Sequence, residues 1–128
     1  MRAGTWNVRG LKPKKIQVEQ AIQEMQLDIV CLQETLANEK NPARIDGMQV
    51  WSSEAGRGLA IGLRREFVGK LVGEPSEVLM TVRACNSYGS ALICCVYVPH
   101  DRTRLTMDTI GEKVRQLRRN NEPLFLLG

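Results

Sequence analysis

The sequence predicts an α/β fold of the α+β type, in which a mainly antiparallel sheet carries flanking helices. Three features indicate it: one helical pattern between two β-prone segments, a series of short strand-like segments, and a second helical pattern before a final apolar strand. The 128 residues are 43% hydrophobic and 25% charged, with 11 Gly and 5 Pro. This composition fits one globular domain and excludes collagen-like, low-complexity and fully disordered chains.

The N-terminal part reads as strand, helix, strand. Thr5–Val8 is β-prone, and Gly10 and Pro13 end it. Apolar residues at helical spacing predict a helix over Ile16–Met25. The continuous apolar run Asp28–Leu32 then suits a strand that is buried on both faces.

The middle of the chain alternates short apolar runs with Gly, Pro and Asn. Five further strands are expected, at Met48–Trp51, Leu59–Leu63, Phe67–Val72, Val78–Ala84 and Ala91–Val98. Because the connections between them are short, we expect a largely antiparallel meander. A second amphipathic helix over Arg104–Arg119 and a buried strand over Pro123–Gly128 complete the chain.

The charge balance favours polyanionic partners. The formal net charge is +4 and the pI is about 9.1. Basic side chains gather at positions 9–15, 102–104 and 115–119, although each cluster alone also fits a solvated surface. No apolar run approaches the ~20 residues of a membrane-spanning helix, and the N-terminus lacks the apolar stretch of a signal peptide. We therefore expect a soluble, intracellular protein without a membrane partner.

The residue inventory disfavours zinc and permits magnesium. The four cysteines form no Cys-x-x-Cys pair, and His100 is the only histidine. Asn7 follows the first predicted strand, and Glu34 follows the buried run. Side chains at neighbouring strand ends can converge, and their oxygen atoms are hard donors that suit Mg²⁺. From the residues alone, Asn7 could equally begin a turn and Glu34 could be an exposed loop acid.

A third candidate segment follows the strand at Ala91–Val98. Tyr97 ends a very apolar strand, so its hydroxyl needs a partner, which could be a phosphate oxygen or a backbone carbonyl. His100 could contact phosphate or be an ordinary surface side chain, and Asp101 fits a turn or the start of a helix.

Four segments in register resemble successive motifs of the endonuclease/exonuclease/phosphatase superfamily. They are Trp6–Leu11 (Trp-Asn-Val-Arg-Gly-Leu), Asp28–Thr35 (Asp-Ile-Val-Cys-Leu-Gln-Glu-Thr), Val96–Pro99 (Val-Tyr-Val-Pro) and Leu126–Gly128 (Leu-Leu-Gly). The first of them is most similar to the apurinic-like endonuclease domains of non-LTR retrotransposons. Many DNA-repair members have Asp where this chain has Arg9, and the loss of that carboxylate favours a simpler metal site and disfavours abasic-site repair. At His100 the repair enzymes commonly have Asn, so the resemblance is compatible with a phosphate contact there.

The resemblance covers residues 1–128 but only the N-terminal half of the family's domain. In the family, Leu-Leu-Gly is followed by an Asp-x-Asn motif and later by Ser-Asp-His, so we expect a domain truncated before Asp-x-Asn. The resemblance implies half of a four-layer α/β-β/α sandwich. We expect this half to supply most of one sheet, with both helices on its outer face. The opposite face would be exposed where a second sheet normally packs, and it would promote self-association.

The resemblance also implies roles for individual residues. Glu34 and Asn7 would hold Mg²⁺, or Mn²⁺ in its place, and Tyr97 would contact the phosphate. Arg9, His100 and Arg102 would bind the phosphates of DNA. The implied function is a Mg²⁺-dependent DNA endonuclease of retrotransposon type, nuclear in a eukaryotic host, and inactive as a half-domain. Two alternatives stay open: a superfamily phosphatase, and a non-catalytic nucleic-acid-binding or interaction remnant of a mobile element.

Overall fold

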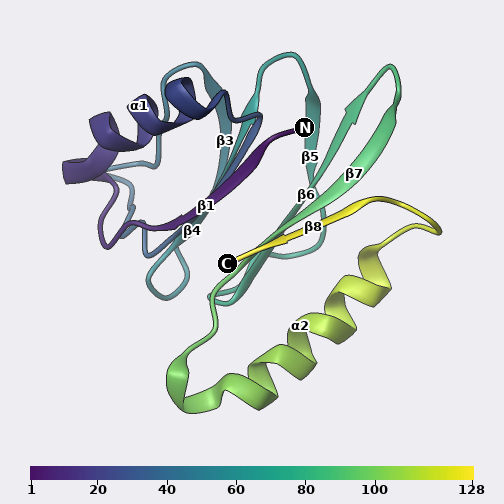
Figure 1. Cartoon of the computed structure of the whole chain (residues 1–128). Helices are drawn as coiled ribbons and strands as arrows, with labels where there is room; N and C mark the ends of the chain where they lie inside the picture. Colours follow the sequence, from purple (N-terminus) through teal and green to yellow (C-terminus); the bar gives the residue numbers. More distant parts are fainter.

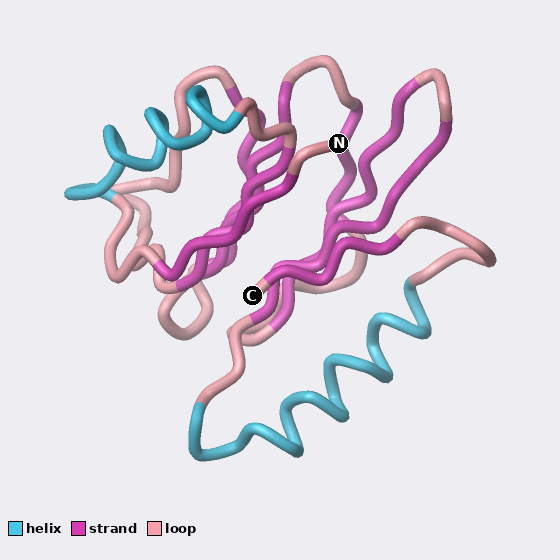
Figure 2. The backbone as a smooth tube through the Cα atoms, viewed as in Figure 1, coloured by secondary structure: helices cyan, strands magenta, loops and turns pink.

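Eight strands and two α-helices make up the structure, a computed structural model that describes residues 1–128 (Figures 1 and 2). The strands are β1 (Ala3–Asn7), β2 (Ile29–Gln33), β3 (Met48–Ser53), β4 (Leu59–Arg64), β5 (Val68–Leu71), β6 (Leu79–Asn86), β7 (Gly89–Val96) and β8 (Leu124–Leu127). The helices are α1 (Lys15–Met25) and α2 (Thr103–Leu117), each preceded by a short 3-10 helix, η1 (Lys12–Lys14) and η2 (His100–Arg102). Neither α-helix has the length and hydrophobicity needed to cross a bilayer.

The strands form two four-stranded sheets. The first has the order β1-β2-β4-β3 and the second has the order β5-β6-β7-β8. In each sheet one edge strand is parallel to its neighbour, β1 to β2 and β8 to β7, while the other pairs are antiparallel. The predicted meander is therefore interrupted between β4 and β5, where the chain leaves the first sheet and enters the second.

The two sheets pack face to face around the largest core cluster. Ile29 and Ile61 of the first sheet meet Val82 and Ile93 of the second, and all four side chains are fully buried. Along one side of the sandwich Gly69 of β5 lies against the ring of Trp51 of β3, so closely that any Cβ at position 69 would collide with the indole. The sheets are thus held together by dense apolar packing between their central strands and along the β3–β5 side.

The two helices cover opposite outer faces of the sandwich (Figure 1). Val18 and Ile22 of α1 pack in a cluster with residues of β2, and Ile110 and Val114 of α2 pack in a cluster with residues of β7. α1 ends where Gln26 adopts a left-handed conformation (φ 53°) and Leu27 N–H bonds to the Ile22 carbonyl. The result is four layers: helix, sheet, sheet, helix.

This arrangement corrects two expectations. The chain does not supply most of one sheet with both helices on one face, because it contributes four strands to each of two sheets. The face that was expected to be exposed, and to drive self-association, is the buried inter-sheet core. Strands buried on both faces have the same apolar pattern whichever sheet they join, so the pattern cannot assign them.

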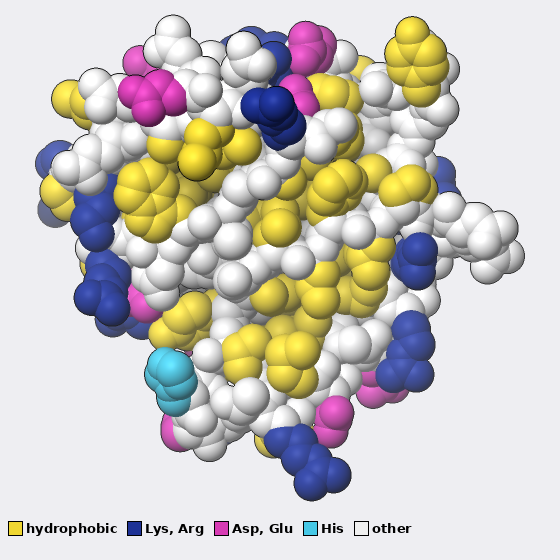
Figure 3. Space-filling view, in the orientation of Figure 1, with side chains coloured by type: hydrophobic (Ala, Val, Ile, Leu, Met, Phe, Trp, Pro, Cys, Tyr) yellow, Lys and Arg dark blue, Asp and Glu magenta, His cyan; other side chains and the backbone are white.

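One side of the sandwich remains open at the edge strands β1 and β8. Figure 3 views the molecule onto these strands and shows hydrophobic side chains exposed between the charged rims. Leu126 of β8 is 47% exposed, whereas Phe125 and Leu127 partly cover the inter-sheet core.

A buried ion pair ties the end of α2 and the following loop to β6. Glu122, only 4% exposed, accepts hydrogen bonds from Arg83 Nε (2.7 Å) and Nη2 (2.9 Å), and from Ser90 Oγ (3.1 Å). Arg83 Nη2 also donates to the Leu117 carbonyl at the end of α2 (2.9 Å). Because every polar group has a partner, this cluster can place β8 beside β7 without leaving a charge unpaired.

Candidate active site

The site begins where the parallel strands β1 and β2 end side by side. Asn7, the last residue of β1, is in register with Gln33, the last residue of β2, and Glu34 follows at once. Asn7 Nδ2 donates a hydrogen bond of 2.7 Å to Glu34 Oε2. The two residues that the sequence singled out as candidate metal ligands therefore lie in direct contact.

The backbone around Glu34 is held in an unusual conformation. Arg9, Glu34 and Leu36 all have positive φ, between 50° and 55°. The loop after β1 and the loop after β2 are joined by two backbone hydrogen bonds. Gly10 N–H donates to the Glu34 carbonyl (2.8 Å), and Leu11 N–H donates to the Thr35 carbonyl (3.0 Å). Non-glycine residues in this region carry strain that the surrounding structure must offset, and such residues often occur at functional sites.

Arg57, in the loop between β3 and β4, completes the surroundings of Glu34. Its Nε donates to Glu34 Oε1 at 2.8 Å, while Asn7 holds the other carboxylate oxygen. Arg57 is not among the site residues predicted from the sequence. The signal that could have found it is its place between two glycines, Gly56 and Gly58, in a loop that precedes a buried strand.

The charge of Glu34 is stabilised by these neighbours. Its pKa lies below the ordinary value, first because of the hydrogen bond from Asn7, then because of the hydrogen bond and positive charge of Arg57, with a further contribution from the charge of Arg9. The side chain is 13% exposed. Glu34 is therefore an anion at neutral pH, as a ligand for a hard cation must be.

Next to this carboxylate lies a small pocket of about 230 Å³. Its lining includes Arg57, Tyr97 and Arg102. The Tyr97 ring packs against the inter-sheet core, and no hydrogen bond within the chain engages its hydroxyl. Arg102 lies 3.9 Å from both Glu77 and Asp101. His100 is exposed in η2 and does not line this pocket, so of the predicted phosphate contacts only Tyr97 and Arg102 meet here.

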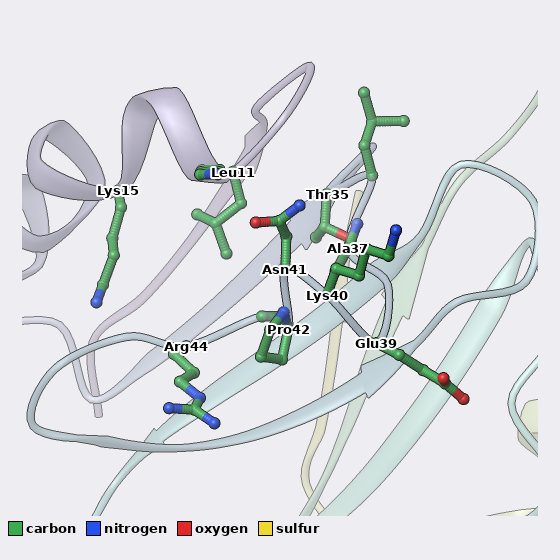
Figure 4. Close-up of a pocket in the computed structure, with 12 residues that line it drawn as sticks. Leu11, Lys15, Thr35, Ala37, Glu39, Lys40, Asn41, Pro42 and Arg44 are labelled. Carbon is green, nitrogen blue, oxygen red and sulfur yellow. The ribbon is translucent and has the colours of Figure 1, made fainter.

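A basic groove of about 420 Å³ is lined by Thr35 and Leu36, the two residues that follow Glu34, and by four basic side chains (Figure 4). Lys12 lines it from η1 and Lys15 from the start of α1, and Lys40 and Arg44 line it from the loop that follows Glu34. Lys14, of the same predicted cluster, instead donates to the Val8 carbonyl (2.6 Å) and so has a structural contact. Lys40 and Arg44 were not predicted, because only the fold brings that loop against η1.

The donor set fits one hard cation that keeps most of its water. A carboxylate and an amide are available at the strand ends, but the chain has no group of three or more His, Cys, Asp or Glu side chains that could hold a metal. Mg²⁺ commonly binds proteins through one or two carboxylates, with water and substrate phosphate in its other positions. Glu34, with Asn7 beside it, is the place in this chain where such an ion fits.

The sequence model of the Endonuclease/Exonuclease/phosphatase family matches residues 4–128. The chain belongs to the endonuclease/exonuclease/phosphatase family. This confirms the family resemblance and the fold class, and it makes the chain a member of a superfamily of nucleases and phosphatases. No curated protein matches the chain.

Solved structures of this family share the fold at low sequence identity. The endonuclease domain of TRAS1, a telomere-specific non-LTR retrotransposon, has a TM-score of 0.67 and 13% identity, covering 94% of this chain and 55% of that domain. AP endonuclease LMAP from Leishmania major has a TM-score of 0.63 and 18% identity, covering 88% of this chain and 46% of that one. TDP2 of D. rerio, complexed with a single-strand DNA product, has a TM-score of 0.65 and 15% identity, with coverages of 94% and 56%. This family member thus spans about half the length of the solved structures that it resembles.

Proposed function

We propose that this chain contributes to a Mg²⁺-dependent phosphodiester hydrolase that acts on DNA, of the retrotransposon endonuclease type. The observation that carries the proposal is the contact between Asn7 and Glu34 at the shared end of β1 and β2. The pocket lined by Arg57, Tyr97 and Arg102 and the basic groove lined by Thr35 and Leu36 both lie beside it. A metal-binding carboxylate, with phenol and guanidinium groups that can donate to phosphate oxygens, supplies part of what cleavage of a phosphodiester requires.

In this proposal each side chain has a stated task. Glu34 holds the cation, and Asn7 orients the carboxylate through its hydrogen bond. A bound Mg²⁺, or Mn²⁺, would supply electrostatic stabilisation of the scissile phosphate and its leaving oxygen. Tyr97 and Arg102 bind the phosphate oxygens, and Arg9 and the groove lysines hold the flanking DNA backbone through salt-sensitive contacts. His100 is assigned an outer phosphate contact, because it lies in η2 next to Arg102.

The pocket beside Glu34 is lined by one further carboxylate, Glu77, which pairs with Arg102 (3.9 Å), and His100 lies outside the pocket. In this proposal neither residue is assigned the task of activating water. The family resemblance assigns that task to the Asp-x-Asn and Ser-Asp-His motifs. Loss of water activation alone typically costs ~10²–10⁴ in rate, and loss of positioning costs more. We therefore propose that the 128 residues alone are inactive.

The test is nicking of supercoiled plasmid by a chain extended through both motifs. We expect nicking with Mg²⁺ and none with EDTA, and we expect Glu34→Ala to abolish it. Glu24→Ala on the exposed face of α1 is the matched control and should leave nicking unchanged. Full activity of the Glu34→Ala variant, or nicking by the 128-residue chain, would contradict the proposal.

A second candidate function is a non-catalytic nucleic-acid-binding module. It is favoured by one observation: N–H donors from Asn7 and Arg57 engage both oxygens of Glu34. Such a module would bind DNA equally well in Mg²⁺ and in EDTA, and Glu34→Ala would not weaken the binding. The hydrolase proposal predicts that Mg²⁺ strengthens DNA binding and that this gain disappears in Glu34→Ala.

A further inference from the structure

We propose that Arg57 is a further residue of this site: its guanidinium neutralises Glu34 until a divalent cation binds, and then turns to the phosphate beside Tyr97. The inference rests on the proposed function, because it concerns the same carboxylate and the same phosphate. It adds to the site a residue that lies outside the four family motifs and that binds two partners in succession, first Glu34 and then the phosphate.

The backbone of the β3–β4 loop is fastened to the segment that carries Glu34. Leu36 N–H donates to the Arg57 carbonyl (2.9 Å), and Thr35 N–H donates to the Gly58 carbonyl (3.2 Å). Arg57 is therefore held one strand away from Glu34 by two hydrogen bonds of its own loop. Its side chain meets the carboxylate from a fixed starting point, unlike an arginine on a free surface loop.

Two glycines make this close fit possible. Gly58 has a φ of +91°, and a Cβ there would collide with the Thr35 hydroxyl. Gly56 has a φ of +59°, and a Cβ there would lie 2.7 Å from the Cβ of Glu77. Only residues without side chains fit at both positions. The loop thus presents a single functional side chain, Arg57, between the Glu34 segment and the loop that carries Glu77.

The difference in exposure lets one partner move while the other stays. The Arg57 side chain is 55% exposed, whereas the Glu34 side chain is 13% exposed and also held by Asn7. A cation at the carboxylate and the guanidinium repel each other, and an ion pair whose arginine is exposed to solvent has only a small free energy to oppose their separation. The arginine is consequently the group that leaves.

A second position for the guanidinium is already formed. Arg57 lines the 230 Å³ pocket together with Tyr97, Arg102 and Glu77. A phosphate there would meet two guanidinium groups, a phenol and one carboxylate, that of Glu77, which is paired with Arg102 (3.9 Å). A guanidinium group binds two phosphate oxygens in a planar, bidentate geometry, which the ammonium group of a lysine cannot form. The same side chain can therefore serve as counter-ion of Glu34 and as ligand of the phosphate.

The first measurement follows the cation without any turnover. Binding of Mn²⁺ to the 128-residue chain is measured by electron paramagnetic resonance, and the Arg57 Nε–H signal is followed by NMR during a Mg²⁺ titration. We expect Arg57→Ala to bind Mn²⁺ about two- to fivefold more tightly than the unmodified chain, since a competing positive charge has been removed. The Arg57 Nε–H signal should shift as Mg²⁺ is added. Arg64→Ala is the matched control, because Arg64 pairs with Asp28 (3.8 Å) at the opposite end of β2.

The second measurement follows the phosphate. Binding of a fluorescein-labelled single-stranded DNA oligonucleotide is measured at constant ionic strength, with Mg²⁺ and with EDTA. We expect Arg57→Ala to weaken oligonucleotide binding about fivefold in Mg²⁺. In EDTA the substitution should leave binding unchanged, because the Arg57 guanidinium is then paired with Glu34 and does not contact the phosphate. Arg57→Lys should restore little of the loss, because an ammonium cannot form the planar contact.

The outcomes separate this inference from the proposed function. If Glu34→Ala abolishes Mn²⁺ binding but Arg57→Ala leaves Mn²⁺ affinity unchanged or weaker, the role of Arg57 is overturned while the metal carboxylate stands. An equal loss of oligonucleotide binding in Mg²⁺ and in EDTA would make Arg57 an ordinary surface charge and also overturn the inference. If Glu34→Ala leaves Mn²⁺ binding intact, the proposed function and this inference fail together.

Discussion

Asn7 and Glu34 are 27 positions apart in the sequence, and the Asn7 side-chain amide donates to the Glu34 carboxylate at 2.7 Å. The contact follows from the parallel pairing of β1 and β2, which ends at Asn7 and Gln33. Parallel strands end at the same edge of a sheet, so the residues at and after their ends must meet. The predictions below test this contact and the features that surround it.

Removal of the Asn7 amide should raise the pKa of Glu34. In the folded chain this pKa lies below its ordinary value, with the Asn7 hydrogen bond as the largest cause, so Asn7→Ala should shift it upward toward that value. The measurement is a pH titration of the Glu34 carboxyl carbon by NMR. Asn41→Ala, in the basic groove, is the control and should leave the titration unchanged. An unchanged pKa in Asn7→Ala would show that the amide does not hold the carboxylate in solution.

Acid should destabilise the fold through Glu122. Its pKa is lowered from an ordinary value of 4.5 to about 2, first by the hydrogen bonds from Arg83. A lowered folded-state pKa contributes stability that is fully present above about pH 4.5 and is lost as the pH falls toward 2. The contribution is of order 3 kcal/mol. It should appear as a falling free energy of unfolding in urea titrations between pH 5 and about 2.

Glu122→Gln should remove most of that pH dependence. It should also destabilise the fold by roughly 3 kcal/mol at pH 7, because the nearly buried Arg83 loses its counter-charge. Glu112→Gln, on the exposed face of α2, should change neither quantity. An equal slope with pH in Glu122→Gln and in the unmodified chain would show that other carboxylates dominate acid unfolding.

Two glycine-to-alanine substitutions should have opposite effects. Gly58→Ala combines a positive φ with a collision at Thr35, so we expect a loss of about 2 kcal/mol or more and a displaced Glu34 segment. Gly111→Ala lies within α2 with no atom near the added Cβ, so we expect a gain of about 0.5–1 kcal/mol from helix propensity. Thermal unfolding followed by circular dichroism measures both. A neutral Gly58→Ala variant would argue against the tight contact between the two loops.

Charge removal from the basic groove should reduce the salt dependence of DNA binding. Lys40→Ala and Arg44→Ala should each lower the slope of log K against log salt by about 0.9 on duplex DNA if each neutralises one phosphate. Lys70→Ala, an exposed lysine on the edge strand β5, is the control and should leave the slope unchanged. If the slope of log K against log salt falls equally in all three variants, the groove is not a specific binding path for DNA.

Local patterns located most elements. The helix predicted over Ile16–Met25 is α1 at Lys15–Met25, and the one predicted over Arg104–Arg119 is α2 at Thr103–Leu117. Helical spacing and turn residues act within a few positions of each other, so they are visible in the chain itself. The order of elements and the meeting of Asn7 with Glu34 follow from the same patterns, because a strand-helix-strand unit places its two strand ends together.

Only the tertiary structure decided which strands share a sheet and what surrounds Glu34. β4 and β5 are neighbours in the chain, yet they belong to different sheets, because the largely buried central strands β2, β4, β6 and β7 need apolar partners on both faces. Arg57 likewise reaches Glu34 across 23 positions through pairing of β2 with β4, a contact with no local pattern. Strand pairing and side-chain contacts between distant segments depend on the packing of the whole chain, whereas helix spacing and turns depend on neighbouring residues alone.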